Sequence, residues 1–161
     1  MRSIRYFGNG TLKMVEAPEP EIKRADEVKI RVAYCGVCGS DLHFKRAELD
    51  FLFEGDGGTP IGHEATGVIT ELGPAATCKG LKVGDRVVYY YNEHCGSCYY
   101  CRNGQEQFCE NMTGTSAAFS DYIVVREQSV HKLADTCSLK KGALIASKRY
   151  VSSLLRQYCK S

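Results

Sequence analysis

Alternating apolar and polar positions over several short segments predict a mainly β fold. The clearest segment is 27–34, where Val28, Ile30 and Val32 alternate with polar neighbours and would form one buried face of a strand. Weaker strand patterns occur at residues 3–7, 11–15, 65–72, 86–91, 118–125 and 130–133. Glycine, proline and polar residues separate these segments. This pattern of short strands and turns predicts a closed or nearly closed β-barrel.

The segments between the predicted strands hold turns and only short helices. The Gly-Asn-Gly sequence at residues 8–10 suits positive φ angles and predicts that the first two strands form a hairpin. Ser40 is placed to cap a short helical turn that runs to Lys45, and residues 138–145 read as a second helix. Residues 147–161 carry apolar side chains at helical spacing together with basic residues, which predicts an amphipathic helix.

Composition supports a compact domain and argues against nucleic-acid and membrane partners. With 161 residues, of which 43% are hydrophobic, the chain is long enough for one domain with its own core. The formal net charge is only +2, and no basic run alternates with aromatic residues as it does in nucleic-acid grooves. No run of about 18 apolar residues predicts a membrane span, and the first residues lack the apolar core of a secretory leader.

Four of the nine cysteines gather in the polar segment 92–111. Their spacing is C-x-x-C-x-x-C followed after seven residues by the fourth, at Cys95, Cys98, Cys101 and Cys109. The segment has no apolar period that would pack four thiols in a core, and four thiolates are a common ligand set of structural zinc. Two disulfides or a redox pair are the alternatives. The odd cysteine count and the missing leader disfavour disulfides and predict a reducing, cytoplasmic compartment.

A second group of candidate ligands is divided between two separated motifs. Cys38 lies in Cys-Gly-Ser-Asp, whereas His63 and Glu64 follow a glycine later in the chain. A thiolate and an imidazole are common ligands of catalytic zinc, which needs about three protein ligands and an open position. Ser40 and His43 are then close enough in sequence to carry a proton away from a zinc-bound alcohol. Taken alone, a cysteine and a histidine separated by a loop are more often core residues than metal ligands.

Taken together, these motifs resemble the zinc-dependent medium-chain alcohol and polyol dehydrogenases, specifically their N-terminal catalytic domain with its GroES-like fold. The resemblance extends from about Ser3 to Ile145 and keeps the family's order. Its motifs are Gly36-Val-Cys38-Gly-Ser-Asp41-Leu-His43, Gly62-His63-Glu64, Gly84-Asp85-Arg86-Val87 and the four spaced cysteines. It implies a mainly β domain over residues 1–146, a partly closed barrel with few short helices. The zinc-binding cysteine lobe would occupy 92–111 and a divergent C-terminal tail 147–161.

The resemblance also implies a role for each candidate residue. Cys38 and His63 would bind a catalytic zinc, with Glu64 as an inner-sphere or exchanging ligand. Ser40 and His43 would relay the proton. The lobe would hold one structural zinc through Cys95, Cys98, Cys101 and Cys109. The implied substrate is a small alcohol or polyol and the hydride acceptor is NAD(P), while homo-oligomer formation stays open.

Two further features bear on the substrate. At the position of Gly39, many family members carry Arg or His, which meets the cofactor pyrophosphate. The Gly-Ser-Asp sequence found here is instead similar to the polyol, sugar and threonine dehydrogenase branches. A glycine required by backbone geometry is the alternative. Residues 48–60 combine glycines and acids with Phe51, Leu52 and Phe53, which predicts a mobile loop. In the resembling family this loop rims the substrate cleft, whereas the alternative is that the phenylalanines anchor it on the core.

The sequence departs from the family pattern in two places. A nicotinamide-binding unit requires G-x-G-x-x-G between a strand and a helix, and no such pattern occurs in the chain. Ala146-Ser147 stands where family members tend to carry Glu-Pro beside the catalytic zinc. We therefore expect the catalytic portion of an NAD(P)-dependent alcohol or polyol dehydrogenase, truncated before its nucleotide-binding domain and inactive alone. The alternative is a non-enzymatic zinc-binding β-domain that serves as a metal-binding or partner module.

Overall fold

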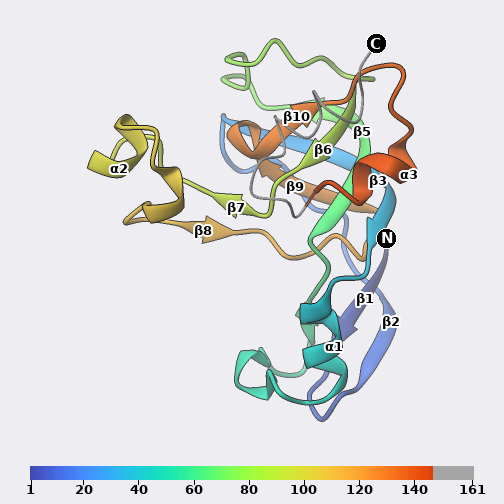
Figure 1. The fold of residues 1–161 in the computed structure, drawn as a ribbon. Helices are drawn as coiled ribbons and strands as arrows, with labels where there is room; N and C mark the ends of the chain where they lie inside the picture. The colour runs from blue at the N-terminus through green and yellow to red at the C-terminus, as the bar shows by residue number, and fades with distance from the viewer. Residues whose placement is uncertain (147–161) are drawn as a thin grey trace.

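The computed structural model describes residues 1–146, and strands dominate it, as the alternating sequence predicts (Figure 1). Its largest sheet has five strands, and every neighbouring pair in it is antiparallel. In spatial order these strands are β10 (Val130–Lys132), β6 (Arg86–Tyr89), β5 (Glu64–Leu72), β3 (Glu27–Gly36) and β9 (Tyr122–Arg126). The helix predicted at 147–161 lies outside the described residues, and the domain boundary at 146 stays a prediction.

The alternation along β3 produces the predicted buried face. Val28 and Ile30 are almost fully buried, and Ile30 lies opposite Ile123 of β9 on one side and Ile69 of β5 on the other. Cross-strand pairs of branched side chains pack well on a pleated surface. Burial of each such side chain contributes about 1.5–3 kcal/mol to folding, so this row forms the centre of the hydrophobic core.

Two register shifts in the β3–β5 pairing accompany the curl of the main sheet. They occur between Lys29 and Ile30 and between Val32 and Tyr34. A bulge adds a residue to one strand of a pair, which bends that strand and increases its local twist. The curled sheet and the short helices confirm the predicted fold class, a mainly β, partly closed barrel.

The predicted hairpin is present at the N-terminus. β1 (Arg2–Tyr6) pairs antiparallel with β2 (Leu12–Glu16), and Gly8, Asn9 and Gly10 between them have φ angles of 76°, 48° and 68°. β4 (Thr59–Pro60) pairs with the other edge of β1. An isolated bridge between Ser3 and Ser120 joins this small sheet to the segment that precedes β9.

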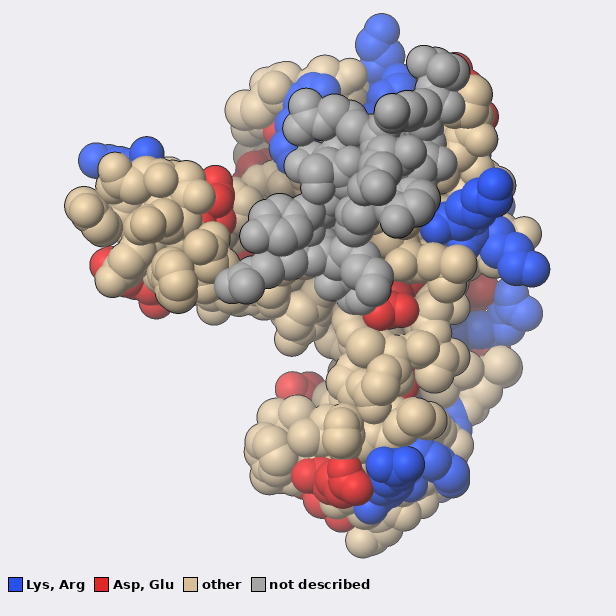
Figure 2. Space-filling model, viewed as in Figure 1, with Lys and Arg blue, Asp and Glu red and all other residues tan. Residues whose placement is uncertain are grey.

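A short ribbon of β7 (Asn92–Glu93) and β8 (Thr113–Gly114) carries the cysteine lobe away from the main sheet (Figure 1). Its two helical turns are α2 (Tyr99–Arg102) and η2 (Glu106–Phe108). Tyr99 is 68% exposed and Phe108 is 57% exposed, so the lobe has little apolar core of its own. Figure 2 shows the lobe as a projection, with a hollow between it and the lower part of the molecule that contains α1.

The helices in residues 1–146 are short. They are α1 (Gly39–Lys45), α2, α3 (Leu139–Ala143) and the single turns η1 (Asp50–Leu52), η2 and η3 (Glu127–Ser129). None of them has both the length and the apolar composition needed to cross a membrane. The prediction that Ser40 caps the first helix is wrong: the N-cap is Cys38, whose extended backbone donates its N–H to Oδ2 of Asp41 at 2.7 Å.

Three strands are shorter than the sequence pattern indicates, although β10 loses only residue 133. β6 ends at Tyr89 instead of residue 91, and β9 begins at Tyr122 instead of residue 118. The N–H of Ala118 donates to the carbonyl of Gly62, so this part of the chain pairs with the segment before β5 and not with the main sheet. Which backbone partner a residue finds depends on tertiary contacts that the alternation of residue types does not encode.

The 48–60 segment contains η1 and β4, so it is more ordered in backbone than a plain loop. Phe53 packs edge-on against the buried Tyr6, with ring centroids 6.5 Å apart, whereas Phe51 is 78% exposed. Phe53 therefore anchors the segment on the core, whereas Phe51 lies on the surface. Its mobility stays a prediction.

Ala47 follows α1 with a φ of 60°, in the left-handed region where a Cβ costs about 1–2 kcal/mol. Replacing Ala47 with glycine would remove this strain. The substitution would also lower the free energy of unfolding by about 0.4–1 kcal/mol, because glycine increases the conformational entropy of the unfolded chain. We expect Ala47→Gly to stabilise the protein by about 0.5–1 kcal/mol in urea unfolding. The control is Ala134→Gly, at an exposed turn position without positive φ, which should be destabilising. Equal losses in both variants would contradict the argument.

Candidate metal centres

Local chain geometry brings the four cysteines of the lobe together. Gly96 has a φ of 73°, which turns the chain between Cys95 and Cys98. Cys98 is the N-cap of α2, and the helix presents Cys101 close to it one turn later. Cys109 follows η2 and is the most buried of the four. All four sulfur atoms lie within 4.8 Å of one another.

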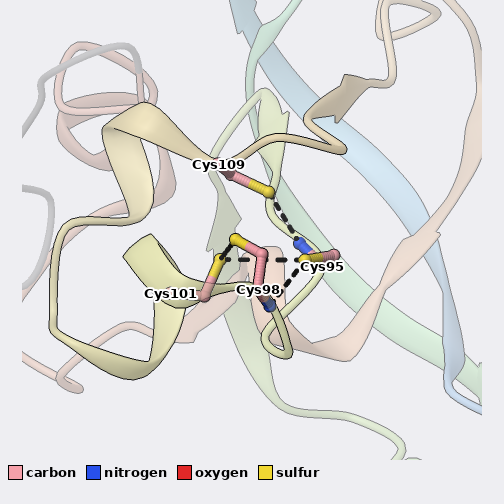
Figure 3. Close-up of side chains that lie close together, drawn as sticks. All are labelled: Cys95, Cys98, Cys101 and Cys109. Carbon is pink, nitrogen blue, oxygen red and sulfur yellow. Dashed lines mark hydrogen bonds between the residues drawn. The ribbon is translucent and has the colours of Figure 1, made fainter.

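The sulfur positions fit one tetrahedral ion (Figure 3). The Sγ atoms of Cys98 and Cys101 are 3.4 Å apart, and those of Cys95 and Cys101 are 3.9 Å apart. Four sulfurs placed at about 2.3 Å from one zinc, at tetrahedral angles, would be about 3.8 Å apart. All four cysteines are free thiols, so the alternative of two disulfides within the lobe is not adopted.

The environment of these thiols favours ionised sulfur at two positions. The backbone N–H and the hydroxyl of Ser97 lower the pKa of Cys95 to about 5, and the backbone N–H of Cys101 lowers the pKa of Cys98. Burial raises the pKa of Cys101 to about 12. Thiolates packed this closely repel one another, so all four ionise together only when a cation lies between them.

The register of the main sheet brings Cys38, His63 and Glu64 together. β3 and β5 pair Gly36 with Glu64, and Cys38 follows Gly36 by two residues at the start of α1. One ligand atom from each of the three residues lies within 4.8 Å of the others. That spacing is well inside about 7 Å, twice the separation of ligand atoms around one zinc, beyond which they would not share an ion.

Two glycines allow close approaches at this second cluster. A Cβ on Gly36 would lie 2.6 Å from Oε2 of Glu64. Gly62 has a φ of 89°, and a Cβ there would lie 2.7 Å from the backbone nitrogen of Phe119. That nitrogen donates a hydrogen bond to the carbonyl of Ile61 at 3.0 Å, so Phe119 has no freedom to retreat. A side chain at either position would therefore force Glu64 or the Phe119 segment to shift.

Asp41 is a buried acid next to this second cluster, only 5% exposed. Its Oδ2 accepts the N–H of Cys38, whereas its Oδ1 is buried and has no hydrogen-bond partner within residues 1–146. Burial raises the pKa of Asp41, and the Cys38 N–H and the nearby His63 oppose that increase. An unpaired buried carboxylate oxygen is costly, so this acid fits a site that acquires positive charge.

The predicted relay residues both lie on α1, but the described structure contains no hydrogen bond between Ser40 and His43. Nδ1 of His43 instead contacts the carboxylate of Glu48. A further aromatic residue lies beside the cluster: the ring of Tyr91 is 5.4 Å from that of His63, inclined at 61°. The sequence carried no motif signal for Glu48 or Tyr91, since neither belongs to a recognisable ligand or relay spacing.

Comparison with known proteins identifies the family. The sequence-family model described as "Alcohol dehydrogenase GroES-like domain" matches residues 24–135, which are 112 of the 161 residues. The chain belongs to the alcohol dehydrogenase GroES-like domain family. This confirms both the resemblance drawn from the motifs and the GroES-like form of the barrel.

Similar proteins of this family include enzymes named for polyols and sugars. The chain is 37% identical over 142 residues to the protein named "Probable D-xylulose reductase A" from Aspergillus fumigatus, covering 83% of this chain and 38% of that protein. It is 36% identical over 131 residues to the sorbitol dehydrogenase of Halalkalibacterium halodurans, covering 78% and 36% respectively. The structure of galactitol-1-phosphate dehydrogenase from Escherichia coli superposes with a TM-score of 0.77 at 29% identity, covering 90% and 41%. The chain thus spans about two-fifths of the length of the curated relatives it matches.

We expect Cys98→Ser to lose one zinc ion per chain, because three thiolates leave the tetrahedral site of the lobe incomplete. The measurement is metal analysis of protein purified with zinc present. Cys78→Ser is the matched control, since Cys78 is an exposed free thiol outside both clusters. Equal zinc content in the two variants would exclude a zinc site in the lobe.

Gly62→Ala tests the second cluster separately. The added Cβ would meet Phe119 at a backbone position with positive φ, so His63 should move and the zinc of this cluster should be lost, while the lobe keeps its own. Gly39→Ala is the control, because Gly39 lies beside Cys38 but has open space around its Cβ position. Zinc analysis that finds the same content in both variants would contradict the claim.

Proposed function

We propose that the chain is the catalytic-domain portion of a zinc-dependent, NAD(P)-linked dehydrogenase that oxidises a secondary alcohol or polyol to a carbonyl compound. The observation that carries this proposal is the convergence of Cys38, His63 and Glu64 from two separated motifs to within 4.8 Å. A thiolate, an imidazole and a carboxylate form a three-ligand set that leaves a fourth position open for substrate. The separate four-thiol lobe would hold a structural ion with no open position.

The residues of the second cluster fit a zinc ion on chemical grounds. The donors are the types that zinc takes, and the unpaired Oδ1 of Asp41 offers compensating negative charge next to His63. Bound there, zinc would supply Lewis acidity that makes an alcohol hydroxyl easier to deprotonate. Cys38 is held for this task by its position as N-cap of α1, and His63 by the glycine that precedes it.

The chain's own side chains would then handle the proton and the substrate. Ser40 and His43, on successive turns of α1, would pass the hydroxyl proton toward solvent, where His43 is exposed. Tyr91 lies against His63 and would border the bound alcohol. Within residues 1–146 no hydrogen bond joins Ser40 to His43, so the proton transfer would involve an intervening water or substrate hydroxyl.

The polyol assignment is supported by the relatives and by Gly39. Two relatives are named for sorbitol and xylulose. A Cβ at Gly39 would meet nothing within 4 Å, and its φ is not positive, so backbone geometry does not require glycine there. The alternative explanation for this glycine is therefore weakened, and the similarity to the polyol and sugar branches remains.

The proposal places the dinucleotide site outside this sequence, because no G-x-G-x-x-G pattern occurs in its 161 residues. Within the proposal, residues 1–146 form the catalytic domain, and a homo-oligomer would be compatible with it. The second candidate is a non-enzymatic zinc-binding β-domain. The observation that supports that candidate is the four-thiol lobe, a closed ligand set that would bind a metal ion without catalysing a reaction.

Cobalt substitution separates these candidates. Co²⁺ reports its own coordination by visible absorption, and a site with an open position changes its spectrum when azide or sorbitol binds. We expect the Cys98→Ser/Cys101→Ser protein, whose lobe keeps only two thiolates and so retains only the second cluster as a three-ligand site, to respond to azide. The Cys38→Ser protein, which keeps only the lobe, should not respond because four thiolates leave no open position.

An azide response from the lobe alone, or no response from the second cluster, would overturn the catalytic assignment. The companion measurement is NADH formation by the zinc-loaded chain with sorbitol, xylitol and 2-butanol. We expect none, since nothing in the sequence holds NAD⁺ in reach. Turnover that is lost in Cys38→Ser would show that a dinucleotide site exists within these residues.

A further inference from the structure

The end of α1 presents an arrangement that the motifs do not include. Nδ1 of His43 contacts the carboxylate of Glu48, five residues later in the chain. We propose that Glu48 is a positioning residue that holds the His43 ring in one orientation and in the Nδ1–H tautomer. This proposal rests on the proposed proton relay for its functional meaning, although its geometry stands independently.

The backbone directs Glu48 onto His43. After α1 the N–H of Ala47 donates to the carbonyl of Phe44 at 3.1 Å, and the N–H of Glu48 donates to the carbonyl of His43 at 3.0 Å. These two bonds, with Ala47 at a φ of 60°, are the Schellman arrangement that reverses a chain at a helix end. Glycine usually occupies that left-handed position, so here the reversal is made against the preference of alanine.

The hairpin between β1 and β2 braces this reversal. Nζ of Lys45 donates to the carbonyl of Gly10 at 3.1 Å. A Cβ on Gly10 would collide with the carbonyl oxygen of Lys45, so the hairpin turn and the helix end are in close contact. The hairpin turn therefore supports the backbone that carries both His43 and Glu48. The supported backbone, and not only the contact between the two side chains, keeps these residues next to each other.

The chemistry of the pair determines which imidazole nitrogen is available. A carboxylate only accepts hydrogen bonds, so the nitrogen that faces Glu48 must carry the proton. The other nitrogen, Nε2, is then left without a proton in the neutral ring and is the acceptor a relay needs. The hydrogen bond from His43 also lowers the pKa of the Glu48 carboxyl, which keeps it ionised.

Exposure argues that this pair acts on orientation more than on stability. The side chains of His43 and Glu48 are 51% and 48% exposed, and ion pairs in such surroundings contribute little to folding. A tautomer preference needs only a persistent hydrogen bond at one nitrogen, which the braced backbone supplies. An incidental surface pair would leave the ring free to adopt either tautomer.

The test is long-range ¹H–¹⁵N correlation of the full chain labelled with ¹⁵N-histidine, in mildly alkaline buffer where imidazoles are neutral. The His43 signals are assigned by their disappearance in His43→Gln. We expect a protonated Nδ1 in the native protein and an inverted tautomer ratio in Glu48→Ala. Glu54→Ala removes another exposed acid after α1 and should leave the native pattern unchanged.

Native His43 in the Nε2–H form, or the same tautomer ratio in Glu48→Ala as in the native protein, would overturn the proposal. A change of equal size in Glu54→Ala would also overturn it, since the effect would then be one of general charge. Failure of the proposed function is recognised separately, because zinc content and the azide response of the cobalt protein do not depend on Glu48. A native tautomer pattern without an azide response would sink the catalytic role and leave the positioning role intact.

Discussion

The pairing of β3 with β5 is the constraint on which both the core and the second metal cluster depend. The same ladder buries Ile30 against Ile69 and sets Gly36 opposite Glu64. Side-chain direction alternates along a strand, so a slip of one residue would expose the core face and turn Glu64 away from Cys38. The burial of apolar side chains fixes the register of the two strands. That register in turn places Cys38 and Glu64, which contribute nothing to the apolar core.

The two metal clusters are organised by different means. The lobe cysteines converge through local turns and one helical turn, in a projection with exposed aromatic side chains and little core. A metal ion bound by the four cysteines would crosslink such a segment and stabilise its folded form. The second cluster is built on strands and a helix end that pack in their own right, so its ligands are brought together by the scaffold.

One short helix organises most of the polar groups around the second cluster. Cys38 caps the N-terminus of α1, Asp41 closes its first turn, and His43 meets Glu48 where the chain reverses at the other end. A helix of seven residues is not stable alone in water. Contact with the turn at Gly10 is therefore part of what maintains the site, although that turn contributes no ligand.

The sequence by itself determined the features that depend on near neighbours: the buried face of β3, the hairpin, the cysteine spacing and the family motifs. It pointed to Ser40 as the helix cap because a thiol is an unusual cap, and it carried no sign of Tyr91 beside His63 or of Glu48 beside His43. Only the tertiary structure decided these contacts. These contacts depend on strand register, chain reversal and packing between distant segments. No local pattern of residue types encodes these three features.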